Sequence, residues 1–126
     1  MKYFLILTTL IFSLYNCSEP EQKPAVKEPT TAADDINIGK QLFLNNNCNG
    51  CHGDTGLGDG PAGQALNPKP RVFKDIYAYR KGHSEDQITA MLEFGLEGSP
   101  MKGYPHLNVE QRRHIAKYVV WLQKQP

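Results

Sequence analysis

The pentapeptide Cys48-Asn49-Gly50-Cys51-His52 decides how the rest of this sequence is interpreted. It gathers two thiols and an imidazole, all able to bind metals or cofactors, within one short stretch. A CxxC pair alone is also compatible with a disulfide, a thioredoxin-like redox motif or half of a zinc site. The redox motif is expected beside a βαβ unit, and a zinc site needs a second Cys/His pair at finger spacing. Neither pattern is found in the sequence.

The histidine that directly follows the second cysteine makes the pentapeptide an attachment motif for c-type haem. At the end of a helix, both thiols can reach the vinyl-derived carbons along one edge of a porphyrin. The imidazole of His52 then projects under the ring, where it can bind the iron. We therefore expect one haem, covalently attached through Cys48 and Cys51, with His52 as its proximal ligand.

Helical patterns lie on both sides of the motif, and strand-like alternation is absent from the sequence. A first helix is expected to begin after Asp34 or Asp35 as N-cap and to run toward the cysteines. Ser84-Glu85-Asp86-Gln87 is a capping box that opens a second helix, which ends at Gly95. A third helix begins near Asn108. Its apolar stripe has helical spacing and consists of Ile115, Tyr118, Val119 and Leu122.

The stretch from Gly53 to Tyr79 is rich in Gly and Pro and is predicted to be mostly loop. A structureless stretch of this length is unusual inside a compact domain. A bulky apolar ligand at the centre, around which the loops wrap, removes this difficulty. The predicted fold class is therefore all-α, with three main helices and long loops wrapped around one covalently bound haem.

Residues 1–16 have the composition of a secretory signal peptide. The apolar run from Tyr3 to Tyr15 is too short for a membrane-spanning helix, which needs roughly 20 residues. It ends at Leu14-Tyr15-Asn16-Cys17, which resembles the lipobox of bacterial lipoproteins. We expect cleavage before Cys17 and a diacylglyceryl group on its thiol. The alternative is an ordinary signal peptide cleaved nearby, which would release the protein into the periplasm.

A flexible linker is expected after the lipidated cysteine, over residues 17–33, because prolines, alternating charges and a single Val cannot build a core. The folded domain should then span residues 34–126. The formal net charge is +1, which gives no support for nucleic-acid binding. A lipid and a linker would hold this domain at the periplasmic side of a bacterial membrane.

Beyond the pentapeptide, residues 35–126 resemble the class I cytochrome c family. The resemblance implies the cytochrome c fold, a single haem with histidine and methionine ligands, and electron transfer rather than catalysis. The matching stretches, in chain order, are Gly39-Lys40-Gln41-Leu42-Phe43, Cys48 to Gly53, Gly56-Leu57-Gly58-Asp59-Gly60-Pro61, Leu66-Asn67-Pro68-Lys69-Pro70, Gly98-Ser99-Pro100-Met101 and the final aromatic-rich helix.

The resemblance also implies which side chain binds the iron opposite His52. The family's distal ligand lies in a Gly-x-Pro-Met-type loop before the last helix, and Met101 matches that position. Met91 is the other thioether candidate, but it shares a helical face with apolar neighbours, which is the usual place of a core filler. His106 is a rival in the same loop as Met101, whereas His83 is expected to be exposed.

Supporting positions follow from the same resemblance. The family packs its first and last helices crosswise, and Gly39, Phe43 and either Tyr118 or Trp121 match that crossing. His114 is expected on the solvated face of the last helix.

Two further features of the middle loop remain open at the level of sequence. In the family, a proline after the haem motif positions the carbonyl that holds the proximal imidazole, and Pro68 and Pro70 are both candidates. The same loop is basic, and its cations could neutralise haem propionates, form a docking patch or simply be solvated. They are Lys69, Arg71, Lys74, Arg80 and Lys81.

Histidine and methionine together fill both axial positions of the iron, and the thioether favours the ferrous state. The sequence therefore predicts an exported, monomeric one-electron carrier whose donor and acceptor are membrane or periplasmic redox proteins. One alternative is an electron-transfer subunit of a fixed oxidoreductase complex. A peroxidase or small-ligand haem protein is a less favoured alternative, because it needs an open position on the iron.

Overall fold

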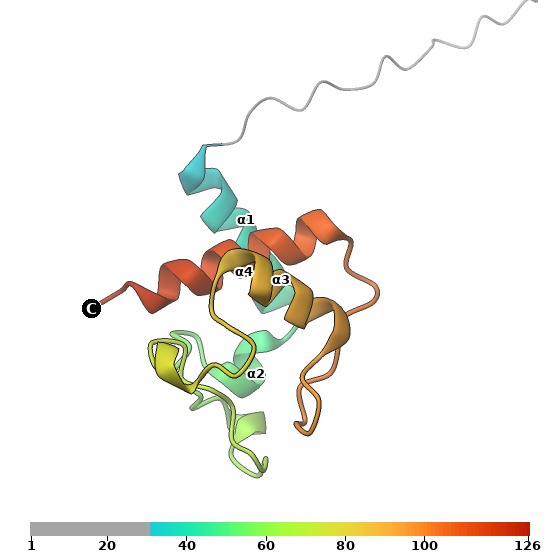
Figure 1. Ribbon diagram of the computed structural model, residues 1–126. Coiled ribbons are helices and arrows are strands. Elements are labelled where there is room, and N and C mark those ends of the chain that lie inside the picture. The colour runs from blue at the N-terminus through green and yellow to red at the C-terminus, as the bar shows by residue number, and fades with distance from the viewer. Residues whose placement is uncertain (1–30) are drawn as a thin grey trace, which may run out of the picture.

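The computed structural model describes residues 31–126, so the predicted signal peptide, Cys17 and most of the predicted linker lie outside the described residues. Within residues 31–126 the chain is helical and contains no strand, which confirms the all-α prediction (Figure 1). None of these described helices is both long and apolar enough to cross a membrane. The elements are α1 (Ala32–Asn45), α2 (Cys48–His52), the 3-10 turns η1 (Pro61–Gly63) and η2 (Ile76–Ala78), α3 (Glu85–Phe94) and α4 (Val109–Gln123).

Each of the three long helices begins at a capping box, in which two otherwise free backbone N–H groups are satisfied reciprocally. Ser84 is the N-cap of α3, as predicted, and Asn108, near which the last helix is expected to begin, is the N-cap of α4. The predicted N-cap of α1 is wrong. Thr31 is the N-cap and accepts the N–H of Asp34 at 3.2 Å, while the Asp34 carboxylate accepts the N–H of Thr31 at 3.0 Å.

Helices α1 and α4 cross, and α3 packs beside α4 (Figure 1). Gly39 lies at the crossing, where a Cβ atom would lie only 2.1 Å from the carbonyl oxygen of His114. Phe43 meets Tyr118 edge-on, with ring centroids 5.4 Å apart. Trp121 stacks on Tyr118 and remains 41% exposed. Of the two aromatic candidates on α4, Tyr118 therefore makes the contact with α1.

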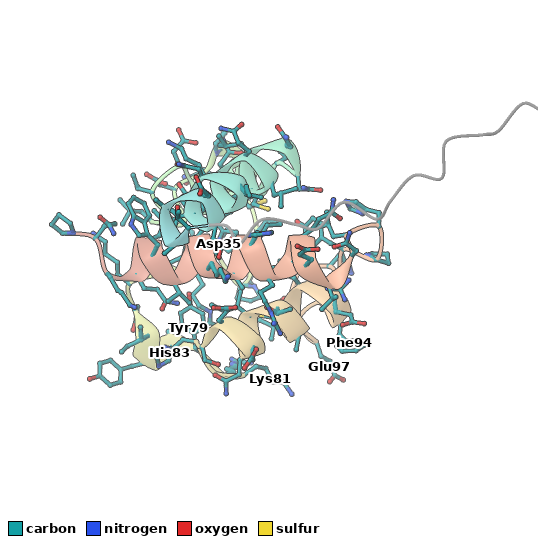
Figure 2. The ribbon with its side chains drawn as sticks, turned by 90° about the horizontal axis from the view of Figure 1, so that it is seen from above. Asp35, Tyr79, Lys81, His83, Phe94 and Glu97 are labelled. Carbon is teal, nitrogen blue, oxygen red and sulfur yellow. The ribbon has the colours of Figure 1, made fainter. Side chains whose placement is uncertain are left out.

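The expectation that His114 lies on the solvated face of the last helix is wrong, because its side chain is turned toward α1. Its Nδ1 atom lies 3.4 Å from the carboxylate of Asp35, and the side chains are only 14% and 13% exposed. The ammonium group of Lys117 binds the same carboxylate. Asp35 is labelled in Figure 2, where α1 passes α4. The close approach at Gly39 places this flank of α4 against α1.

The core is built from the three long helices, Cys48 of α2 and two loop residues. Its buried side chains include Phe43 of α1, Leu92 of α3 and Ile115 of α4, with Phe73 and Leu107 added from loops. Phe43 and Phe73 meet edge-on at 6.1 Å between centroids. Because Phe73 is anchored in the core, the long loop after α2 is pulled back against the helices.

Candidate haem site

A cavity of about 470 Å³ lies among α2, the long loop that follows it, α3 and the loop between α3 and α4. Its volume lies within the range of small-molecule and cofactor sites. Cys48, Cys51, His52 and Met101 all line this cavity. The fold therefore brings the four predicted site residues together, although Met101 is far from the pentapeptide in the sequence.

The pentapeptide forms a short helix of its own, separate from α1. Asn46 ends α1 by donating both its backbone N–H and its side-chain amide to the carbonyl of Leu42. Asn47 then adopts a left-handed conformation with φ of 55°, and α2 begins at Cys48. Gly53, with φ of 76°, ends the helix immediately after His52. These two backbone turns present the cysteines and the histidine to the cavity as one unit.

The two cysteine sulfurs are not joined by a disulfide, and they differ in environment. Cys48 is buried and Cys51 is half-buried. Burial raises the pKa of the Cys48 thiol to about 11, and a hydrogen bond with Tyr104 opposes part of this rise. In the chain without cofactor, Cys48 is therefore a neutral thiol at physiological pH.

The imidazole of His52 is held by two neighbours from the loop after α2. Its Nδ1 atom lies 3.4 Å from the carbonyl oxygen of Arg71, and its ring lies 4.6 Å from that of Phe73 between centroids. Burial lowers the pKa of His52 and so favours the neutral imidazole, whereas the hydrogen bond to the Arg71 carbonyl raises this pKa. Because Nδ1 is engaged, Nε2 is the nitrogen available to a metal.

The carbonyl that faces His52 resolves the choice between the two prolines. It belongs to Arg71, and Pro70 directly precedes Arg71 in the sequence, whereas Pro68 is more distant. Both prolines line the cavity, so the position next to Arg71 in the chain is what distinguishes them. Of the two candidates, Pro70 is therefore the one placed to fix this carbonyl.

Glycines let the loop return to His52. The N–H of Gly58 donates to the carbonyl of His52 at 2.8 Å, and the carbonyl of Gly56 accepts the N–H of Phe73 at 2.7 Å. Gly56 has φ of 73°, and a Cβ atom there would lie 2.2 Å from the Phe73 ring. Glycine is therefore required at position 56, because the backbone there packs directly against the Phe73 ring.

Met101 lies in a loop that is closed by short-range hydrogen bonds. The N–H of Leu96 donates to the carbonyl of Met101 at 3.0 Å, and the N–H of Met101 donates to Ser99 Oγ at 3.2 Å. Ser99 Oγ in turn donates to the carbonyl of Leu96 at 2.8 Å. Met101 is half-buried and packs against the core. The loop therefore presents this thioether from a fixed backbone.

The rival ligands lie in different surroundings. Met91 is half-buried and lines the cavity from α3, as the core residues Ile88 and Leu92 of the same helix do. His106 is not among the cavity-lining residues, and its Nε2 atom lies 2.9 Å from the side-chain oxygen of Asn46. His83 is exposed, as predicted, and meets the ring of Tyr79 edge-on (Figure 2). The competition for the distal position is thus between two methionines.

The basic cluster of the middle loop is divided by the fold. Lys69, Arg71 and Arg80 line the cavity, whereas Lys74 binds the carbonyl of Pro126 and Lys81 is exposed (Figure 2). Only the first three are placed to meet an anionic group of a bound cofactor. The cluster is therefore not one uniform patch.

Three aromatic residues of the site have no signal in the sequence. Phe73, Tyr79 and Tyr104 all line the cavity, yet each lies in a loop or at its edge without helical or strand periodicity. Only the closure of the loops brings them to the cavity. Tyr104 is placed by its N–H, which donates to the carbonyl of Leu92 in α3 at 2.8 Å.

These residues fit a haem. The donor set consists of two unlinked thiols, a neutral imidazole and a thioether, and the walls are largely apolar. Cationic side chains that line the cavity, such as Arg71, are placed to bind the haem propionates. Binding of a c-type haem requires two thiols for attachment and axial ligands such as an imidazole and a thioether.

Comparison with known proteins agrees with this chemistry. Residues 36–123 match the family model described as cytochrome c, and the chain therefore belongs to the cytochrome c family. Members of this family carry covalently attached haem c and generally act as electron carriers rather than enzymes.

A solved structure is also similar to this chain. It is a chain of the reducing HAO-like protein complex of Kuenenia stuttgartiensis, with a TM-score of 0.65 and 28% sequence identity. The similarity covers 82% of this chain and 51% of that chain, so this chain spans about half the length of its structural relative. No match was found among curated proteins.

Proposed function

We propose that this chain is an exported monohaem cytochrome of the class I type that carries single electrons between redox proteins. The observation that carries the proposal is that Cys48, Cys51, His52 and Met101 line one cavity. The two cysteines would attach the haem, and His52 and Met101 would be its axial ligands. When bound, the haem supplies a one-electron couple between ferric and ferrous iron.

The protein's own contribution would be to bind and orient. The Arg71 carbonyl fixes the imidazole of His52, and the fixed loop around Met101 presents a soft, neutral sulfur. A thioether ligand raises the reduction potential, and two protein ligands leave no open position for oxygen or peroxide. These properties suit a carrier better than a peroxidase.

Met101 is proposed over Met91 because of the backbone that carries each residue. Met91 lies in α3, directly before the buried Leu92, so the helix dictates its position. Met101 lies in a loop after a serine and a proline, where hydrogen bonds within the loop hold its backbone. The position in the chain also agrees with the distal ligand implied by the family.

Lipidation of Cys17 and a periplasmic location at a bacterial membrane are proposed from the sequence. The supporting features are the apolar leader and the lipobox-like Leu14-Tyr15-Asn16-Cys17. Mass spectrometry of the mature protein tests this proposal. A diacylglyceryl-modified N-terminal cysteine supports it, and an N-terminus without that cysteine contradicts it.

A second candidate function is electron transfer within a fixed complex. It is favoured by the similarity to a chain of the HAO-like protein complex. That chain is about twice as long as the part of it that matches. Mild detergent extraction followed by size-exclusion chromatography separates the two functions. Elution at the mass of the single chain supports the carrier, whereas elution with a redox enzyme through several columns supports the subunit.

The carrier proposal is tested by the reactivity of the reduced protein at neutral pH. A carrier with two firm axial ligands exchanges electrons reversibly with a soluble mediator and shows no spectral change under carbon monoxide. Prompt binding of carbon monoxide would favour the small-ligand alternative. Catalytic consumption of hydrogen peroxide would favour the peroxidase.

A further inference from the structure

Tyr79 has no role in the proposed ligation, yet it contacts both residues that hold His52. It follows η2, lines the cavity and is half-buried (Figure 2). Its hydroxyl donates to the carbonyl of Phe73 at 3.4 Å. Its ring lies under the guanidinium of Arg71, whose Cζ atom is 4.7 Å from the ring centroid.

Those two partners are the neighbours of the imidazole. The Arg71 carbonyl lies 3.4 Å from Nδ1 of His52, and the Phe73 ring lies 4.6 Å from the His52 ring between centroids. Tyr79 is therefore linked to the imidazole through both of these neighbours. One link is the hydrogen bond from Tyr79 to the Phe73 carbonyl, and the other is the contact of the Tyr79 ring with the Arg71 guanidinium.

Tyr79 is itself fixed to the helical part of the fold. The side-chain amide of Gln123, in the last turn of α4, donates to the Tyr79 hydroxyl at 3.2 Å. This bond joins segments that are distant in the sequence. The hydroxyl thus has a donor partner on α4 and an acceptor partner in the loop, so both of its hydrogen-bonding roles are used.

We infer that Tyr79 is a positioning residue for His52, which holds Phe73 and Arg71 in place from α4 and thereby sets the strength of the hydrogen bond at Nδ1. The inference rests on the proposed function, in which His52 binds iron. Partners of the second ring nitrogen fix the orientation of a ligating histidine and raise its basicity. A more basic imidazole stabilises ferric iron, so weakening this hydrogen bond raises the midpoint potential.

The test is Tyr79→Phe in the holoprotein, because this change removes the hydroxyl and keeps the ring under Arg71. The midpoint potential is expected to rise. Exchange of the His52 Nδ1 proton with solvent, followed by NMR in the reduced protein, is expected to accelerate about fivefold, since one hydrogen bond is worth about 1 kcal/mol. Gln123→Leu is expected to change both quantities in the same direction by a smaller amount.

Tyr77→Phe is the matched control, since Tyr77 belongs to the same turn and is 95% exposed. It is expected to change neither quantity. The inference is overturned if Tyr79→Phe keeps the wild-type potential and exchange rate, or if the potential moves while the exchange rate does not. Should Tyr79→Phe fold poorly, the same two readouts on Gln123→Leu decide. A wild-type protein that binds no covalent haem would instead contradict the proposed function.

Discussion

Gly39 of α1 lies against the backbone carbonyl of His114 in α4, so closely that a Cβ atom would lie 2.1 Å from the oxygen. Gly39→Ala must therefore push the two helices apart. Overpacking of this kind costs about 1–3 kcal/mol, whereas replacing a glycine within a helix gains roughly 0.5–1 kcal/mol. We expect a net loss of about 1–2 kcal/mol in the free energy of unfolding.

Urea denaturation followed by circular dichroism checks this value. The control is Asn37→Ala, an exposed position on the same helix, which should not lower the midpoint. A Gly39→Ala protein at least as stable as the wild type would show that the helices do not cross at this residue.

The assignment of the distal ligand is tested by Met101→Ala and Met91→Ala. Loss of the thioether in Met101→Ala should lower the midpoint potential and abolish the weak long-wavelength absorption band that marks methionine–iron ligation in this family. It should also allow carbon monoxide to bind. Met91 lines the same cavity, and the Met91→Ala variant should retain the band. The reverse pattern would assign the ligand to Met91.

His106 is expected to act as a loop anchor and not as a ligand. Its bond to Asn46 joins the Met101 loop to the end of α1, and a hydrogen bond of this kind contributes about 0.5–1.5 kcal/mol. His106→Ala should lower the free energy of unfolding by about that amount and keep the methionine band. Asn37→Ala, at an exposed position of α1, should change neither. Loss of the band in His106→Ala would speak for iron ligation.

The capping box of α1 gives a pH dependence. Hydrogen bonds from the side chain and backbone of Thr31 lower the pKa of Asp34 below its ordinary value of 3.8. A carboxylate with a lowered pKa stabilises the folded helix above the ordinary value and loses that effect as pH falls through the folded value. The first turn of α1 should therefore lose amide protection below about pH 3.8. Hydrogen exchange measures this.

Asp34→Asn provides the comparison, since it cannot titrate. In that variant the protection of the first turn should depend less on pH in this window. An unchanged pH dependence would mean that another group controls the start of the helix.

Local signals predicted the parts of the fold that depend on neighbouring residues. The capping residues Ser84 and Asn108 and the terminator Gly95 are each recognised from a few adjacent positions. Thr31 was missed because Asp34 is also a common N-cap residue, and only the reciprocal bonds identify Thr31 as the cap.

Features that depend on long-range contact could not be predicted in this way. The His114 side chain is shielded because Gly39 lets α1 approach α4 closely. Helical spacing in the sequence does not predict the distance between two helices. Phe73 and Tyr79 reach the site only because the Gly-rich loop folds back onto His52. Met91 and its neighbour Leu92 both line the cavity, which their helical spacing alone does not reveal.

Covalent attachment of one haem through Cys48 and Cys51 underlies the whole proposed function. The most direct measurement is the absorption spectrum of the purified polypeptide, produced with haem-maturation machinery, before and after extraction with acidified acetone. We expect a c-type haem spectrum that stays with the polypeptide and is lost in the double variant Cys48→Ala, Cys51→Ala. A colourless protein, or pigment that moves into the acetone, would contradict it.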